Sequence, residues 1–223
     1  AFEKMDASND VRAIVLCSEG KHFCAGNNFG SASRNEERAD RKVEDGNPLY
    51  AAAVKLFDTK TPVVGAIQGA AVGGGFGLAV MPDFRVVCPE ERFTANFVKL
   101  GFHPGFGLTH TLPRLIGQQK ASMLFLTGRR ISGQEAFDIG LADVITDKAN
   151  LRAEAIKLAA EIAENAPLAV ASVRATMRQG IAEAVQKQTD HEGLEQHRLQ
   201  QTADHREGVK AVGERRPGNF IGA

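Results

Sequence analysis

The sequence predicts an α/β core followed by a helical region, and two observations along the chain carry that prediction. In the first half, short runs of β-branched apolar residues alternate with segments whose apolar residues have helical spacing. From Leu168 onward the helical spacing is almost continuous, and charged residues become more frequent toward Arg216. Strands that alternate with helices are typical of α/β layers. We therefore expect an α/β core over residues 1–165 and a C-terminal helical region over residues 166–223.

The first predicted elements are two apolar strands separated by a polar segment and a helix. Val11 to Cys17 is a β-branched run bounded by turn residues, which suits a buried strand. Ser31 to Asn47 is polar and rich in charge, so we expect a loop or a frayed helix there. Leu49 to Asp58 has helical spacing, and Pro62 to Ile67 is the next strand.

Three adjacent glycines, Gly73 to Gly75, lie between that second strand and a helix that we expect to end near Asp83. A third strand, Phe84 to Val87, follows directly. Glycines at the start of a helix leave backbone N–H groups unshielded by any Cβ, with the positive end of the helix dipole behind them. Such a segment attracts a negatively charged or polarised oxygen.

The remainder of the chain is predicted to be mainly helical. Helical spacing covers Leu108 to Ile116, Gly117 to Leu126, and Leu151 to Asn165. Ser132 with Glu135 three residues later has the pattern of a capping box at a helix start. The chain itself begins in what resembles the end of an amphipathic helix, so we expect further residues upstream.

Composition excludes several classes of function. Hydrophobic residues make up 43% of the chain and charged residues 24%, which is typical of a globular protein. Lys plus Arg and Asp plus Glu number 27 each, so no positive excess favours nucleic acid or an anionic membrane as partner. No apolar segment is long enough to span a bilayer. A soluble protein in a reducing compartment, the cytoplasm, is the expectation.

The three cysteines, Cys17, Cys24 and Cys88, are an odd number in apolar segments and lack the spacing of a zinc site. We interpret them as buried, reduced thiols. A group of His and Glu residues between His191 and His205 resembles a metal site in composition. No pair there combines with a fixed third ligand, so we interpret it as a solvated helix face and predict no metal site.

Four separated motifs together resemble the crotonase superfamily, the enoyl-CoA hydratases and isomerases. The motifs are Lys21 to Asn28, Pro62 to Asp83, Leu126 to Val144, and Glu207 to Phe220. Each is weak by itself, but they occur in the family's order over nearly the whole chain. The resemblance implies a spiral core of repeated ββα units with C-terminal helices that mediate assembly into a homotrimer or a hexamer made of two trimers.

Members of this superfamily bind acyl-CoA thioesters and polarise the thioester carbonyl with two backbone N–H groups. The resemblance assigns these donors to Ala25 and Gly74. It also assigns the main chain from Phe23 to Asn27 to the coenzyme A cradle, with Lys21 near the phosphates. Further residues assigned to the substrate site are Cys24, Gly73, Gly77, Phe97 and Phe220. No resident cofactor is implied, because coenzyme A enters as part of the substrate.

The sequence departs from the superfamily at the positions that transfer protons. Members that add water to enoyl-CoA use two glutamates, and the matching positions here are Gly77 and Phe97. Isomerases often keep a carboxylate at the second position or eight residues beyond it, where this chain has Gly105. General acid–base groups contribute about 100- to 10,000-fold to rates. Hydration or a double-bond shift that relies on glutamate is therefore not what this site encodes.

His103 is the best remaining candidate for an acid or base, because imidazole titrates near neutral pH. It lies in a glycine-rich loop where relatives have an apolar residue, and Asn96, Lys99 and His110 lie on the same segment. The alternative is a structural histidine held by hydrogen bonds. Likewise, Asn27 and Asn28 either select the acyl group or simply form a turn.

Other interpretations of the site stay open at this stage. The three glycines could serve helix packing alone, whereas the spacing fits neither a P-loop nor a dinucleotide-binding fingerprint. Within the superfamily, decarboxylation, C–C bond cleavage and thioester hydrolysis need enolate or oxyanion stabilisation with little help from carboxylates. A member that binds acyl-CoA without turnover is the alternative from a different class.

Overall fold

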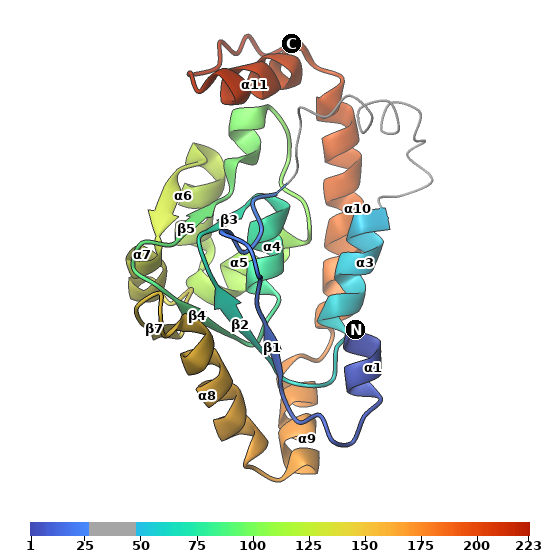
Figure 1. Ribbon diagram of the computed structural model, residues 1–223. Coiled ribbons are helices and arrows are strands. Elements are labelled where there is room, and N and C mark those ends of the chain that lie inside the picture. The colour runs from blue at the N-terminus through green and yellow to red at the C-terminus, as the bar shows by residue number, and fades with distance from the viewer. Residues whose placement is uncertain (27–47) are drawn as a thin grey trace.

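A computed structural model describes residues 1–26 and 48–223 of this chain. Its largest sheet has four parallel strands in the order β1-β2-β4-β7, with helices on both faces (Figure 1). The strands are β1 (Ile14–Leu16), β2 (Val63–Ile67), β4 (Phe84–Val87) and β7 (Val144–Ile145). Each of the four is parallel to its neighbours. The predicted α/β layering is confirmed.

A second, smaller sheet has the order β3-β5-β6. Its strands are β3 (Ala70–Val72), β5 (Arg92–Thr94) and β6 (Arg130–Ser132), with β3 parallel to β5 and β5 antiparallel to β6. Gly69, with φ of 71°, forms the turn by which the chain passes from β2 in one sheet to β3 in the other. The sequence analysis missed these strands because runs of three residues are too short to show a period.

The helices follow the strands in the order that the repeated ββα pattern requires, because β2 and β3 lead into α4, and β4 and β5 lead into η2. The helices of the first part are α1 (Phe2–Asp6), α3 (Pro48–Phe57), α4 (Gly74–Val80), the 3₁₀ helix η2 (Asn96–Leu100), α5 (Leu108–Ile116), α6 (Gln118–Thr127) and α7 (Gly133–Asp138). Those of the second part are α8 (Leu151–Ala163), α9 (Pro167–Met177), α10 (Ile181–Gln200) and α11 (Ala203–Glu214).

The core has a layer on each face of the parallel sheet. On one face, Val64 and Val86 pack against Leu151 and Ala155 of α8. On the other face, residues of β2, α4, β5 and α5 form the largest apolar cluster, which contains Phe76 with no exposed surface. Side chains of successive strand residues point to opposite faces, so a strand covered on both sides is mainly apolar along its whole length. This is why the apolar run after Pro62 has no polar residue.

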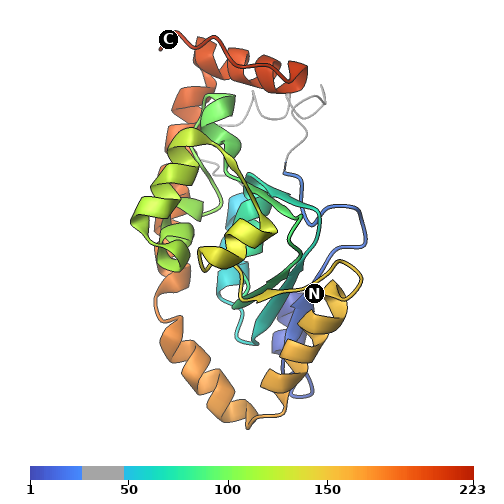
Figure 2. The same cartoon turned by 90° about the vertical axis from the view of Figure 1, so that its left-hand side faces the viewer.

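The C-terminal helices wrap around the outside of this core. Helix α10 runs beside α3, and α11 lies across η2 (Figure 1). Helix α9 stands at the lower end of the molecule, where it joins α8 to α10 (Figure 2). It contains no buried residue, but Arg174 near its end pairs with Asp83 at 2.8 Å. The helical C-terminal region expected from the sequence is therefore present, packed on the α/β core.

Several predicted details are confirmed and several are corrected. The capping box of Ser132 and Glu135 is present at the start of α7. Helix α4 ends at Val80, earlier than predicted, and the first strand covers only three residues of its predicted run. Cys88 is buried, whereas Cys17 and Cys24 are only half-buried, contrary to our interpretation. The loop predicted over residues 31–47 lies outside the described residues.

Candidate active site

The segment that ends at Ala25 is fixed to β3 by its main chain. Cys24 forms an isolated parallel bridge with Ala71, in which its N–H donates to Ala70 O at 3.0 Å and its carbonyl accepts from Val72 N at 3.0 Å. The N–H of Phe23 donates to Gln68 O at 2.6 Å. These bonds use the polar groups that precede Ala25. Within residues 1–26 and 48–223, the Ala25 N–H has no acceptor, and the residue is exposed.

The glycine segment presents a second amide of the same kind. Gly73, with φ of 57°, caps α4 and donates its N–H to Thr94 O at 2.9 Å. Gly74 opens the helix, and its N–H has no acceptor in the described part of the chain. Gly73 and Gly75 are buried, whereas Gly74 is half-buried. A Cβ added at Gly74 would meet no described atom within 4 Å, so the space beside its Cα is open among the described residues.

A close main-chain contact brings the two free amides onto adjoining segments. A Cβ at Gly75 would lie 2.0 Å from Cys24 O and 2.7 Å from Cys24 C, the atom to which the Ala25 nitrogen is bonded. Only glycine permits this approach. The Cys24–Ala25 peptide therefore rests directly against the first turn of α4, next to the peptide that carries the Gly74 N–H.

Aromatic rings lie at both positions that the family resemblance relates to glutamates, because one position is Phe97 itself and the other, Gly77, is covered by Phe106. Phe97, on η2, is 5% exposed, and its Cζ lies 3.7 Å from where a Cβ of Gly73 would stand. A Cβ at Gly77 would lie 2.6 Å from Cβ of Phe106 and 2.7 Å from its ring. Any side chain at residue 77 thus collides with Phe106. Phe106 therefore fills the space that a side chain at residue 77 would enter.

His103 lies in the loop between Phe97 and Phe106 with its ring orientation fixed. Its Nδ1 is 2.9 Å from Pro104 O, and since that oxygen can only accept, Nδ1 carries the proton. This leaves Nε2 with a lone pair, and among the described residues it has no hydrogen-bond partner. The ring also packs edge-on against His191 of α10 at 5.8 Å. Nε2 is the atom through which His103 can exchange a proton.

Comparison with known proteins identifies the family that this chain resembles. The family model described as enoyl-CoA hydratase/isomerase matches residues 1–223. The chain is 36% identical to (E)-benzylidenesuccinyl-CoA hydratase of Thauera aromatica, over 96% of this chain and 83% of that protein. It is 31% identical to the peroxisomal Delta(3,5)-Delta(2,4)-dienoyl-CoA isomerase of Arabidopsis thaliana, over 86% of this chain and 73% of that protein.

The chain belongs to the enoyl-CoA hydratase/isomerase family. A crystal structure of an enoyl-CoA hydratase/isomerase from Pseudoalteromonas atlantica T6c matches the fold with a TM-score of 0.85 and 28% identity, over 99% of this chain and 86% of that one. The resemblance to the crotonase superfamily, the crotonase-like fold and the assignment to an enzyme family that acts on acyl-CoA are therefore confirmed.

The structure corrects the interpretation of one residue in the His and Glu group on α10. Glu192 has no exposed surface, so it does not lie on a solvated helix face. Its carboxylate accepts from Gly107 N at 2.7 Å, Thr109 N at 3.1 Å and Thr109 Oγ1 at 2.5 Å. Burial raises the pKa of Glu192 to about 7, against the lowering effect of these hydrogen bonds. In the structure it belongs to a buried stripe with Val185, Thr189 and Gln196, and the polar residues of that stripe do not set it apart in the sequence.

The remaining site residues assigned from the family resemblance lie in different settings. Lys21 is exposed, and its carbonyl packs against Gly69. The Phe23 side chain is in the core, so only its main chain can reach a ligand. Phe220 is 44% exposed in the tail that follows α11. Asn27 lies outside the described residues. Burial and then Arg114 lower the pKa of His110, a neighbour of the site on α5.

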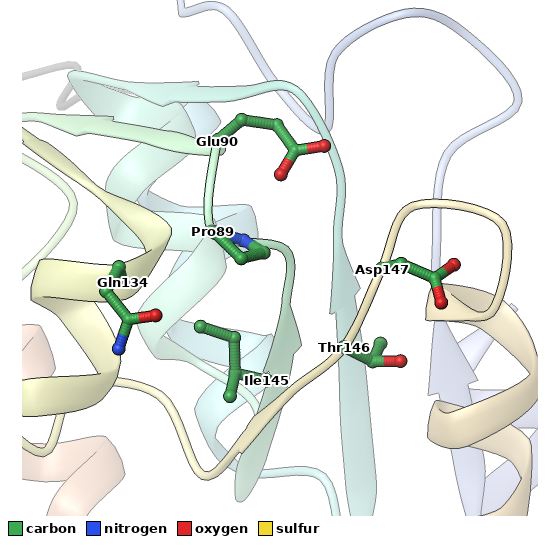
Figure 3. Close-up of a pocket in the computed structure, with 6 residues that line it drawn as sticks. All are labelled: Pro89, Glu90, Gln134, Ile145, Thr146 and Asp147. Carbon is green, nitrogen blue, oxygen red and sulfur yellow. The ribbon is translucent and has the colours of Figure 1, made fainter.

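Two hollows in the surface lie away from the glycine segment. One, of about 280 Å³, is lined by Pro89, Glu90, Gln134, Ile145, Thr146 and Asp147 (Figure 3). The other, of about 300 Å³, lies between α6 and α7. The first contains two carboxylates, which repel a phosphate-bearing ligand. The main-chain site is the better candidate because it alone combines free amides with the family's motif positions.

Proposed function

We propose that this enzyme processes acyl-CoA thioesters by stabilising an enolate-like oxygen with the amides of Ala25 and Gly74. The observation that carries the proposal is the pair of N–H groups without acceptors on the two segments joined at Gly75. Preorganised donors of this kind contribute several kcal/mol, since loss of one typically lowers the rate about 100- to 1,000-fold. The two relatives named above are a dienoyl-CoA isomerase and a benzylidenesuccinyl-CoA hydratase, which supports this substrate class.

We propose His103 as the group that moves a proton, acting through Nε2. Support comes from its fixed Nδ1 hydrogen bond to Pro104 O, which leaves Nε2 as the basic atom. Its loop begins beside Phe97, near Gly73, and ends at Phe106, over Gly77, so the chain between them follows the first turns of α4. Reactions that fit are decarboxylation, C–C bond cleavage and thioester hydrolysis, in which the oxyanion site does most of the work.

Replacing Gly74 with proline is the sharpest test of the oxyanion site. Gly74 is the first residue of α4, a position where proline is well tolerated, so Gly74→Pro removes one N–H while keeping the helix. Gly74→Ala keeps the N–H and places a methyl group in open space, which makes it the matched control. The measurement is the infrared carbonyl stretch of a carbonyl-labelled butyryl-CoA bound to each variant.

We expect the carbonyl stretch to move to lower frequency on binding to the wild type and to Gly74→Ala, and to stay near its free value on Gly74→Pro. Turnover is expected to fall about 100- to 1,000-fold in the proline variant. Equal shifts in all three proteins would refute the assignment of Gly74.

The alternative function is binding of acyl-CoA without turnover. A panel of acyl-CoA substrates, followed by the mass of the products, separates the two functions. Conversion of any of them establishes an enzyme, and His103→Gln should then lose about 100-fold or more of that activity at unchanged CoA affinity. Unchanged turnover in His103→Gln removes this residue from the mechanism. If no substrate is converted and CoA affinity is measurable, the result favours a protein that binds acyl-CoA without turnover.

We further propose that the chain assembles as a homotrimer or as a hexamer of two trimers, with coenzyme A phosphates near Lys21. Support for assembly comes from α9, in which Leu168 is 86% and Met177 75% exposed. Apolar surface of this kind on a helix without buried residues favours contact with another subunit. Light scattering after size exclusion measures the mass, and a monomer at micromolar concentration would contradict the proposal.

Within the described residues, no helix is suited to crossing a membrane and no three His, Cys, Asp or Glu are grouped for a metal ion.

A further inference from the structure

We infer that Glu192 on α10 is a positioning residue of the proposed acyl site. Glu192 holds the turn of residues 105–109. Through Phe106 in this turn, it fixes the position of α4, the helix that presents the Gly74 amide. The inference rests on the proposed function, because it concerns the same oxyanion site. It begins with the carboxylate itself. Oε2 accepts from Gly107 N, and Oε1 accepts from both Thr109 N and Thr109 Oγ1.

These contacts satisfy a carboxylate without any exposed surface, and all three donors belong to Gly107 and Thr109 in one turn of the chain. In the described part of the chain, no Lys, Arg or His forms an ion pair with Glu192. A buried carboxylate without a cation is costly unless donors satisfy it. The hydrogen bonds of Glu192 therefore attach α10 to the donors of this turn rather than to a cationic side chain.

The turn needs such support because two successive residues are left-handed. Phe106 has φ of 69° and Gly107 has φ of 66°. A left-handed conformation is unfavourable for a residue with a bulky side chain, and it persists only where surrounding contacts fix it. Glu192 takes the N–H of the residue that follows Phe106, so it fixes the peptide on the C-terminal side of the strained position.

The strained position is the one that meets the oxyanion helix. The ring and Cβ of Phe106 lie against the Cα of Gly77, close enough that no Cβ fits between them. Gly77 is three residues beyond Gly74, and its N–H donates to Gly73 O at 3.2 Å. Movement of Phe106 would therefore displace α4 at Gly77, one turn from the proposed donor at Gly74. Misplacement by about 1 Å is enough to cost on the order of 100-fold in rate.

Two glutamines extend the contact along α10 on either side of Glu192. Gln196 donates to His103 O at 2.9 Å and accepts from the Tyr50 hydroxyl at 2.8 Å. Gln188 donates to Thr109 Oγ1 at 2.8 Å. Residues 188, 192 and 196 are spaced by four, so they lie along one face of the helix. This face holds the loop from His103 to Thr109 at both ends.

The test compares Glu192→Gln with Glu183→Gln, an identical change at an exposed position of the same helix. A glutamine at 192 has one acceptor oxygen for three donors and turns an NH₂ group toward a donor. The probe is carbonyl-labelled butyryl-CoA, read by its infrared carbonyl stretch and by its Kd, together with turnover of any substrate that the panel identifies.

We expect Glu192→Gln to lose at least half of the wild-type carbonyl shift and on the order of 10- to 100-fold in turnover, with Kd nearly unchanged. Glu183→Gln should match the wild type. A folded Glu192→Gln with the full shift and turnover would overturn the inference while leaving the proposed function intact. Absence of any shift in the wild type would overturn the proposed function and the inference together.

If Glu192→Gln does not fold, Thr109→Val decides the matter. It removes only the hydroxyl that donates to Glu192 Oε1 and keeps the volume and both backbone donors. A reduced carbonyl shift in this variant, smaller in size than that expected for Glu192→Gln, supports positioning. A wild-type shift combined with a lower melting temperature would show that the network serves stability alone and would overturn the inference.

Discussion

The two ends of α4 are held in place by different means. At its start, uncharged contacts at glycines dominate, because the Cys24 carbonyl packs against Gly75 and the Phe106 side chain packs against Gly77. Beyond its end, charged side chains dominate, because Asp83 pairs with Arg174 at 2.8 Å and Arg178 at 3.1 Å while also accepting from Val63 N. These three side chains are only 9% to 15% exposed.

The difference shows how one helix can serve both structure and chemistry. Ionic groups close to the proposed oxyanion site would compete for the substrate oxygen, whereas glycine contacts fix the chain without adding any polar group. The charges are therefore used at the far end, where they attach the last turn of α9 and the residue that caps it to the segment between α4 and β4. The amides of Ala25 and Gly74 remain without acceptors among the described residues.

The largest effect is expected from breaking the charged end. Asp83→Asn leaves two nearly buried arginines without their carboxylate, which should lower the free energy of unfolding by about 3–5 kcal/mol. The matched control is Glu19→Gln, which removes the exposed partner of Arg152 and should cost less than about 1 kcal/mol. Urea denaturation measures both. If folded Asp83→Asn loses the carbonyl shift of bound butyryl-CoA as well, the two ends are not independent.

The glycine end is tested by the pair Gly75→Ala and Gly74→Ala. The first places a methyl group 2.0 Å from Cys24 O, so the segment or the helix must move, and we expect a loss of about 3 kcal/mol in stability. The second adds the same atom in open space within a helix and should be neutral or slightly stabilising. Thermal unfolding of the two variants is the measurement. Equal melting temperatures would contradict the close approach at Gly75.

The pH dependence of stability reports how the turn under α10 is held. The pKa of Glu192 is raised from 4.5 to about 7, so the folded protein binds more protons than the unfolded chain between these values. Stability from this group is therefore lost as the pH rises from about 4.5 to 7, by about 3 kcal/mol or less. Urea denaturation of wild type and Glu192→Gln across this range should show a shallower decline for the variant. Parallel curves would refute the raised pKa.

The smallest effect is a coupling between Gly77 and Phe106. Gly77→Ala should cost about 1–3 kcal/mol because its methyl group overlaps Phe106. Phe106→Ala makes room for the added methyl group. The double variant should therefore lose less free energy of unfolding than the sum of the two single changes. Denaturation of all four proteins in the cycle gives the coupling. Strict additivity would show that Phe106 does not occupy this space.

The sequence predicted the strand and helix order better than the sheet arrangement. β2 and β4 appear at their predicted residues, and β2 does so because a continuous apolar run identifies a buried strand. β3, β5 and β6 were missed, since strands of three residues are stabilised by partners distant in the chain rather than by their own pattern. Motifs in the sequence identified Ala25 and Gly74 as candidate oxyanion donors, whereas only the fold shows what surrounds these two residues.

Glu192 shows most clearly what a sequence does not reveal. Its neighbours His191 and Glu195 are more exposed, and nothing in the local pattern distinguishes a solvated carboxylate from one that caps a turn 85 residues earlier in the chain. Gly77 shows the same limit, because the sequence reveals a glycine but not the phenyl ring that lies over it.

By itself the sequence determined the family, the alternation of strands and helices, and the glycines that expose amides, because each depends on local residue order. Tertiary structure decided which amides lack acceptors, which charge is buried and which ring lies over α4. These properties depend on contacts between segments far apart in the chain, where close packing rather than local preference selects the partner.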